Sequence, residues 1–112
     1  MFISEDTGIQ PFVKIGDGSI FFAARIGHHS TIGEFCLMSC CFLAGNITVG
    51  NNVFMGLTSA IQQGVTIANN TIIGMGACIT KDTKEGEVYT TSKDTVKRSD
   101  SDSEIIRNSY LS

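Results

Sequence analysis

The chain lacks the features that mark several common functional classes. No run of Lys or Arg precedes the C-terminal tail, and the 112 residues carry a formal net charge of −3, which argues against nucleic-acid binding. We expect neither a membrane span nor a signal peptide, since Glu5 and Asp6 stand where a signal would have basic and then apolar residues. Histidine is scarce as well, because only His28 and His29 are present. The length fits one small domain whose acid–base chemistry depends on few side chains.

The cysteines lack the spacing of a metal site. Four are present, Cys36, Cys40, Cys41 and Cys78, and none forms the C-x-x-C pair that zinc sites use. Free thiols that pack as small buried hydrophobic side chains explain them better. We therefore expect no metal, and a reducing, cytoplasmic compartment.

The strongest positive feature is an apolar residue at every sixth position. A helix would repeat at three and four and an ordinary strand at two, so this period indicates a chain that turns one corner per six residues. It is typical of a parallel β-helix built from hexapeptide repeats. The inward-pointing residues, called anchors below, are Ile9, Ile15, Phe21, Ile26, Ile32, Met38, Leu43, Val49, Met55, Ile61, Ile67, Ile73 and Ile79.

The texture of the repeats supports this interpretation. A small residue follows most anchors, as in Ile15-Gly16, where glycine would permit a tight corner and a close approach of neighbouring coils. Three faces make a coil of about eighteen residues, and coils stack at about 4.8 Å. The steps that begin at Phe21 and Met38 are one residue short, and we expect both at the same corner of successive coils.

The organisation along the chain follows from the period. Residues 1–91 are predicted to form the β-helix, with 1–8 as a lead-in, the regular repeat over 9–82 and a last strand within 87–91. Residues 92–112 are predicted to be a polar tail that could include a short helix.

Exposed aromatic side chains point to self-association. In this register Phe22, Phe35, Phe42 and Phe54 face outward or lie at corners, which is many for a small solvated solenoid. We expect neighbouring subunits to cover several of them.

A column of candidate functional residues follows one edge of the predicted coil. His28 lies two positions after its anchor, and the same position in later coils holds Gly45, Gln63 and Lys81. Three coil rises, about 14–15 Å, separate the first from the last. The column offers a base, a backbone amide without a side chain, a side-chain amide and a cation, which suits a long ligand with a reactive head near His28 and a phosphate-bearing end near Lys81. Taken singly, the histidines and Lys81 favour ordinary solvated surface residues, and the column shifts that balance for His28 and Gly45 more than for Lys81.

Three segments resemble hexapeptide-repeat acyltransferases. They are Ile26-Gly-His-His-Ser-Thr-Ile-Gly33, Leu43-Ala-Gly-Asn-Ile-Thr-Val-Gly50 and Gly74-Met-Gly-Ala-Cys-Ile-Thr-Lys-Asp82. Within that family the chain is similar to bacterial sugar O- and N-acetyltransferases, including the sialic acid O-acetyltransferases. The resemblance implies a left-handed coil, a homotrimer, and acetyl-CoA as co-substrate between adjacent subunits, with a sugar or nucleotide-sugar as acceptor.

The resemblance also implies roles for individual residues. The catalytic base falls on His28, and the N–H of Gly45 falls where it would contact the acetyl group. Acetyl-CoA contacts fall on Leu37 and, on a second column from a neighbouring subunit, on Leu57 and Met75. The column, and not the resemblance, assigns Gln63 and Lys81 to the rest of the same co-substrate.

The chain departs from the family at two places. Some relatives have a carboxylate directly after the base, where this chain has His29, so His29 is expected to orient or tune the base. Typical members also carry a small acceptor-binding α/β domain before the β-helix, and we expect it to be absent here because Met1 lies almost at the coil.

Other functions remain open at this point. A trimeric β-helix scaffold without catalysis is the main alternative, favoured by that expected absence. A β-helical carbonic anhydrase would need three separated histidine ligands, and only an adjacent pair is present. Other acyl-CoA enzymes, such as succinyltransferases, share the fold signature.

Overall fold

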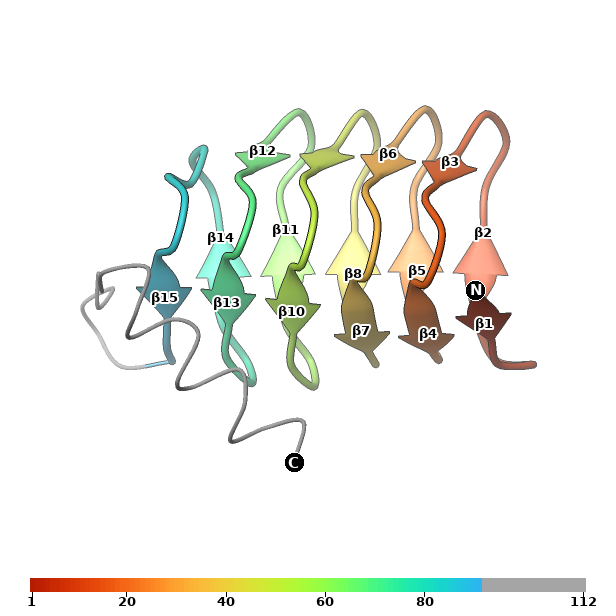
Figure 1. Ribbon diagram of the computed structural model, residues 1–112, viewed down its shortest axis with the longest axis horizontal. Coiled ribbons are helices and arrows are strands. Elements are labelled where there is room, and N and C mark those ends of the chain that lie inside the picture. Colours follow the sequence, from red (N-terminus) through yellow and green to blue (C-terminus); the bar gives the residue numbers. More distant parts are fainter. Residues whose placement is uncertain (92–112) are drawn as a thin grey trace.

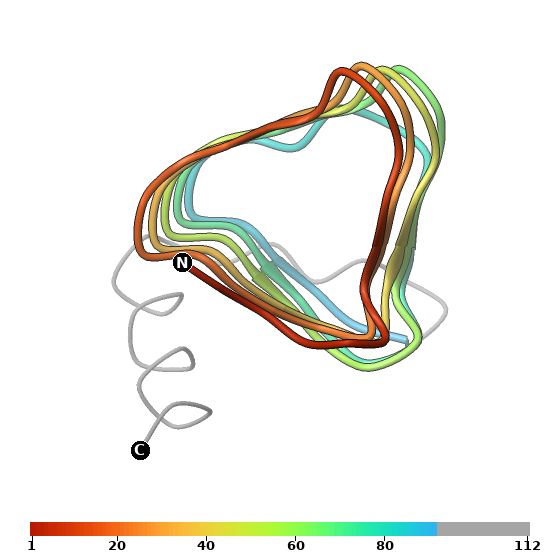
Figure 2. The ribbon, with the colours of Figure 1, turned by 90° about the vertical axis from the view of Figure 1, so that its right-hand side faces the viewer.

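The computed structural model describes residues 1–91, which form fifteen short strands arranged as three parallel sheets (Figure 1). The sheets are the faces of a triangular prism, here called faces A, B and C (Figure 2). Face A comprises β1 (Phe2–Ile3), β4 (Ile20–Phe22), β7 (Leu37–Ser39), β10 (Phe54–Met55), β13 (Ile72–Ile73) and β15 (Val88–Tyr89). Face B comprises β2 (Gly8–Ile9), β5 (Arg25–Ile26), β8 (Phe42–Leu43), β11 (Ala60–Ile61) and β14 (Cys78–Ile79). Face C comprises β3 (Lys14–Ile15), β6 (Thr31–Ile32), β9 (Thr48–Val49) and β12 (Thr66–Ile67).

Each strand pairs with the strand one coil away, so the chain visits faces A, B and C in turn. Arg25 pairs with Phe42, for example, and Ile32 with Val49. Seen from the N-terminal end, the chain runs counter-clockwise as it recedes from the viewer, which makes the superhelix left-handed (Figure 2). The predicted all-β, left-handed parallel β-helix is confirmed for the described residues.

The core of the prism is the predicted ladder of anchors. Ile32 and Val49 are each 2 % exposed, and Ile67 and Ile73 are fully buried, as the six-residue period predicts. Ile9 is 39 % exposed because it belongs to the first coil, which has a neighbouring coil on one side only. Aliphatic burial in successive layers therefore stabilises the coil.

The glycines after the anchors serve close approach of coils and not corner geometry. A Cβ at Gly27 would lie 2.5 Å from the carbonyl carbon and oxygen of Ala44 in the next coil. The left-handed backbone conformation occurs instead at other corner residues, including His29 (φ 57°) and Asn46 (φ 58°). Our expectation that these glycines provide tight-turn dihedral angles was wrong, because the corner turns two residues later.

The coil begins and ends close to the predicted limits. The predicted lead-in 1–8 is wrong, since β1 already pairs with β4 in face A. The last strand is confirmed as β15, which pairs with β13. Both short steps lie at the corner between faces A and B, as predicted. The predicted tail over 92–112, with its possible helix, lies outside the described residues, and in 1–91 no helix could cross a membrane.

Two of the four thiols are buried and two are not. Cys36 and Cys41 lie in the core, whereas Cys40 and Cys78 are exposed, which corrects the expectation that all four pack inside. Cys40 occupies a corner (φ 47°) and Cys78 points outward from β14, since its neighbour Ile79 is the anchor. Burial, with a smaller contribution from Cys40, raises the pKa of Cys41 to about 12.

Candidate active site

The candidate site lies along the corner where the chain turns from face B to face C, called the BC corner. The N–H of Asn46 donates to the carbonyl of His28 (2.8 Å), and the N–H of Gly64 donates to the carbonyl of Gly45 (3.1 Å). These bonds stack His28, Gly45 and Gln63 in successive coils. The predicted column is confirmed for these three residues.

Lys81 continues the column less regularly. It follows Ile79, which pairs with Ile61, by two residues, as Gln63 follows Ile61. The corner then tightens, because Thr83 donates its N–H to Thr66 instead of extending the stacking pattern. Lys81 is exposed and lines a pocket of about 230 Å³ at the C-terminal end of the coil.

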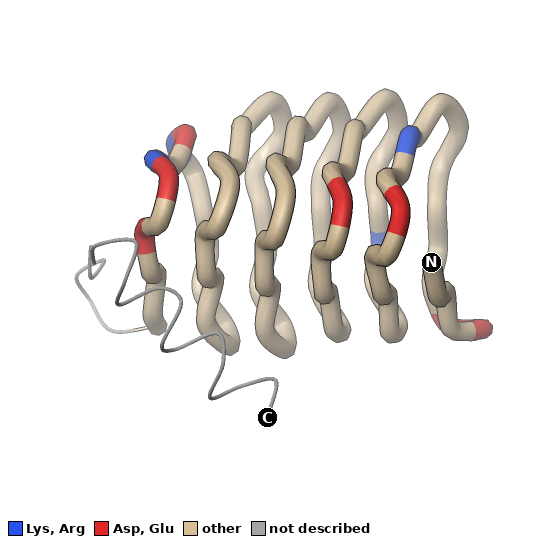
Figure 3. The backbone as a smooth tube through the Cα atoms, viewed as in Figure 1, with Lys and Arg blue, Asp and Glu red and all other residues tan. Residues whose placement is uncertain are grey.

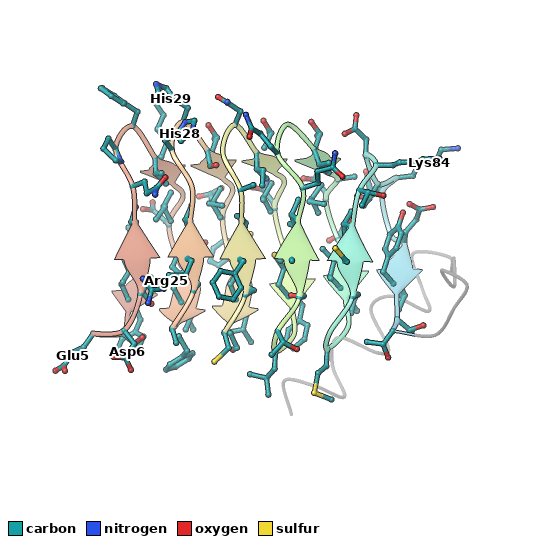
Figure 4. The ribbon with its side chains drawn as sticks, turned by 180° about the vertical axis from the view of Figure 1, so that it is seen from behind. Glu5, Asp6, Arg25, His28, His29 and Lys84 are labelled. Atoms are coloured by element: carbon teal, nitrogen blue, oxygen red, sulfur yellow. The ribbon has the colours of Figure 1, made fainter. Side chains whose placement is uncertain are left out.

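The backbone and ring of His28 are both positioned by neighbouring coils. Its N–H donates to Oε1 of Gln10 (3.0 Å) in the coil before, and its carbonyl accepts from Asn46 in the coil after. The ring leans over Gly45, where a Cβ would lie 2.6 Å from Nε2 of His28. The glycine therefore makes room for the imidazole, which stands at the outer rim of the BC corner (Figure 4).

His29 contacts His28 directly. The two Nδ1 atoms lie 3.1 Å apart, so one ring donates and the other accepts a hydrogen bond. The ring of His29 also stacks on Phe12 in the coil before, with centroids 4.9 Å apart and planes 19° apart. When His29 accepts, His28 carries its proton on Nδ1, and Nε2 is left able to take a proton.

A free donor lies beside this base. The N–H of Gly45 has no hydrogen-bond partner within residues 1–91. One coil further along, the space beside Gly64 is open, since a Cβ there would meet no atom within 4 Å. The BC corner thus combines a proton acceptor, an amide that lies buried beneath the His28 ring, and open surface one coil further along at Gly64. These are groups that acyl transfer to a hydroxyl or amine can use.

The three apolar candidates lie elsewhere on the prism. Leu57 and Met75 occupy the same position of successive coils at the corner between faces A and B, where the N–H of Gly76 donates to the carbonyl of Leu57 (2.8 Å). They are 47 % and 62 % exposed. Leu37 belongs to β7 on face A. One chain does not bring these residues to His28, so a site that uses both sets requires two chains.

Sequence reasoning missed a hollow on face B beside the column. It has a volume of about 350 Å³ and extends from Gly8 across Gly27 to Gly45, with Gln10 and Arg25 among its lining residues. Arg25 precedes the anchor Ile26, so the register alone places it on the outer side of face B. What the register does not give is the direction in which its long side chain folds. Among residues 1–91, no three His, Cys, Asp or Glu side chains are grouped as a metal site.

Several known proteins that resemble the chain are acetyltransferases. No family model matches the chain. A segment of 36 residues, 32 % of this chain, is 53 % identical to galactoside O-acetyltransferase of Escherichia coli (strain K12) and covers 18 % of that protein. The acetyltransferase domain of PglB from Neisseria gonorrhoeae FA1090 superimposes with a TM-score of 0.65 at 23 % identity, over 77 % of this chain and 52 % of that one.

A second solved structure is similar to the same degree. PerB from Caulobacter crescentus, in complex with CoA and GDP-perosamine, has a TM-score of 0.64 at 24 % identity, over 86 % of this chain and 56 % of that one. The chain shares the fold of these acetyltransferases. It spans about half the length of the two solved structures, and the matched segment is a small part of the galactoside O-acetyltransferase.

Proposed function

We propose that the protein is an acetyltransferase that uses acetyl-CoA and acetylates a hydroxyl or amine of a sugar or nucleotide-sugar. The observation that carries the proposal is the position of Nε2 of His28, which stands over Gly45 beside an unpaired backbone N–H. Sugar-modifying acetyltransferases among the similar proteins, one of them bound to CoA and a nucleotide-sugar, support the substrate class. Sialic acids are one acceptor class within this proposal.

The residues at the BC corner fit the co-substrate. Acetyl-CoA supplies a thioester, an activated acyl group. The unpaired N–H of Gly45 can donate to an oxygen that gains negative charge at the acyl carbon. Gln63 and Lys81, both exposed, continue the column and offer an amide and a cation to the remainder of a long ligand.

His28 acts as the general base in this proposal. Its Nε2 accepts the proton of the acceptor hydroxyl or amine as that group attacks, and later returns the proton to the departing thiolate. His29 receives the Nδ1–H of His28 and so keeps Nε2 unprotonated before the reaction. A neutral imidazole does this by hydrogen bonding alone, and Phe12 holds its ring in place.

A homotrimer completes the proposed site. On face A, the residues that precede the anchors form an apolar ladder in register: Phe2, Ile20, Leu37 and Phe54, which keep some exposed surface, and Ile72, which is already buried within one chain. No Asp, Glu, Lys or Arg occurs between Glu34 and Lys81, so the middle coils present an uncharged surface (Figure 3). Such a surface favours burial against further copies of the chain. A neighbouring copy could then supply Leu37, Leu57 and Met75 to the co-substrate.

The compartment we propose is the cytoplasm. Four cysteines remain as free thiols, two of them exposed, which is typical of a reducing environment.

The test is thiol release from acetyl-CoA with galactosides, amino sugars and nucleotide-sugars, GDP-perosamine included. We expect turnover with at least one acceptor and its loss in His28→Ala. Binding of acetyl-CoA without turnover on any acceptor would favour the scaffold alternative. Absence of acetyl-CoA binding would refute the proposal altogether.

A further inference from the structure

The hollow on face B is lined by residues that have no role in the proton transfer proposed for His28. Its lining includes Gly8, Gly27, Ala44 and Gly45, which carry little or no side chain, and Ile9, which is partly exposed, whereas the anchors Ile26 and Leu43 turn their side chains into the core. Its polar side chains are one amide, Gln10, and one guanidinium, Arg25. An apolar surface with a few polar groups at its rim is the usual form of a small-molecule site.

The side chain of Arg25 runs along the outer surface of face B. A Cβ at Gly8 would lie 3.2 Å from Nη1 and 3.3 Å from Cδ of Arg25, so the side chain folds over that glycine. His28, in the same coil, leans over Gly45 in the opposite direction along the prism axis. Arg25 lines the hollow at one end, and Gly45, over which the imidazole of His28 leans, lines it at the other.

The guanidinium has no anionic partner of its own. No carboxylate lines the hollow, and Arg25 makes no ion pair within the described part of the chain. The two acidic residues labelled in Figure 4, Glu5 and Asp6, stand at the corner between faces A and B. Arg presents a planar set of donors that matches a carboxylate or a phosphate.

We propose that this hollow binds the acceptor and that the acceptor carries an anionic group held by Arg25. Three residues of extended chain, about 10 Å, separate the backbones of Arg25 and His28, and their side chains lean apart along the prism axis. That span suits a sugar with an anionic substituent at the end remote from the reacting group. Gln10 also lines the hollow, and because its Oε1 accepts from the N–H of His28, its amide N–H groups are left to donate to a sugar hydroxyl. The inference rests on the proposed function, because it names the acceptor class of that site.

The experiment compares three matched sugars: galactose, galacturonic acid and galactose 1-phosphate. Binding to the full chain in the presence of CoA is measured by calorimetry, and thiol release from acetyl-CoA is measured in parallel. We expect one of the two anionic sugars to bind about tenfold or more tightly than galactose. Galacturonic acid would identify a carboxylate and galactose 1-phosphate a phosphate as the group that is recognised.

The variant Arg25→Gln should abolish that preference and leave the affinity for CoA unchanged. Arg25→Lys should recover part of it, because the charge remains and the planar set of donors does not. The control is Lys14→Gln, which removes an exposed cation from face C and should leave the preference intact. Exposure of Arg25 means that its loss should not unfold the chain, and a thermal melt checks this.

Equal binding of the three sugars, or no binding of any, would overturn the proposal, as would a preference that survives in Arg25→Gln. The two proposals fail separately. Equal rates of thiol release with neutral and anionic sugars would support the acetyltransferase and contradict the anionic subsite. Binding of an anionic sugar that depends on Arg25, without thiol release, would support the subsite and contradict the acetyltransferase.

Discussion

A Cβ at Gly45 would lie 2.6 Å from Nε2 of His28, so the imidazole occupies space that any other residue at position 45 would fill. Because the blocking atoms belong to a movable ring, Gly45→Ala should displace His28 and leave the coil folded. A displacement of about 1 Å at a reacting group can cost about 10²-fold in rate, and we expect a loss of that order in kcat.

A double-mutant cycle makes this prediction specific. In a His28→Ala background, Gly45→Ala should have no further effect on kcat, because the ring it displaces is gone. Thr48→Ser, at an exposed position of face C that does not line the hollow, is the control and should leave the rate near wild type. Equal losses from Gly45→Ala in both backgrounds would show that position 45 acts independently of the imidazole.

The two histidines should differ in their effects on turnover. Loss of a general base costs about 10² to 10⁴ in rate, so His28→Ala should remove most activity while the affinity for acetyl-CoA changes little. His29→Ala should cost less, because it removes the partner of Nδ1 and not the base itself. Should His29→Ala prove the inactive variant and His28→Ala the active one, the assignment of the base would be wrong by one residue.

More of the fold than of the site could be predicted from the sequence. The anchors, the short steps and the stacking of His28 with Gly45 follow from a six-residue period, because identical coils place equivalent positions in columns. The period does not show how long side chains fold, so the approach of Arg25 to Gly8 and the contact of His29 with Phe12 were not predictable. The left-handed dihedral angles of the corners were also assigned to the wrong residues. The glycines after the anchors allow close approach of coils, and residues such as His29 form the corners.

Face A should hold the subunits together. A charged residue in its apolar ladder, Phe54→Glu, should convert the expected trimer to monomer, because a buried unpaired carboxylate is strongly unfavourable. Light scattering at micromolar concentration measures the mass. Thr48→Glu, at the corresponding outward position of face C, is the control and should leave the assembly unchanged. A monomeric wild-type chain would refute the trimer and the two-chain site together.

The anchors should dominate the stability of the coil. Ile67→Ala removes a fully buried side chain and should lower the free energy of unfolding by about 2–5 kcal/mol. The adjacent Thr66 points outward from the same strand, and Thr66→Ala should change it by less than about 0.5 kcal/mol. Denaturant unfolding of the two variants measures the difference. Similar losses at both positions would contradict the register of β12.

Tyr89 in the last coil should make the free energy of unfolding fall as the pH becomes strongly alkaline. Burial, and then the hydrogen bond that its hydroxyl donates to Oε1 of Glu87 (2.5 Å), raise the pKa of Tyr89 above its ordinary value. The same oxygen accepts the N–H of Lys84 (2.7 Å), so the buried carboxylate of Glu87 links the turn before β15 to the strand itself.

The sign follows from the raised pKa. The unfolded chain releases the phenol proton near pH 10 and the folded chain only at higher pH, so the contribution of Tyr89 is complete below about 10 and is lost as pH rises beyond it. At neutral pH, Tyr89→Phe should therefore be less stable than wild type by about 1–3 kcal/mol. Above pH 10 that difference should shrink, whereas the titration of lysines affects both proteins equally. Denaturant unfolding of the pair across this range tests it, and a difference that stays constant with pH would mean that the Tyr89 hydroxyl titrates alike in the folded and unfolded chains.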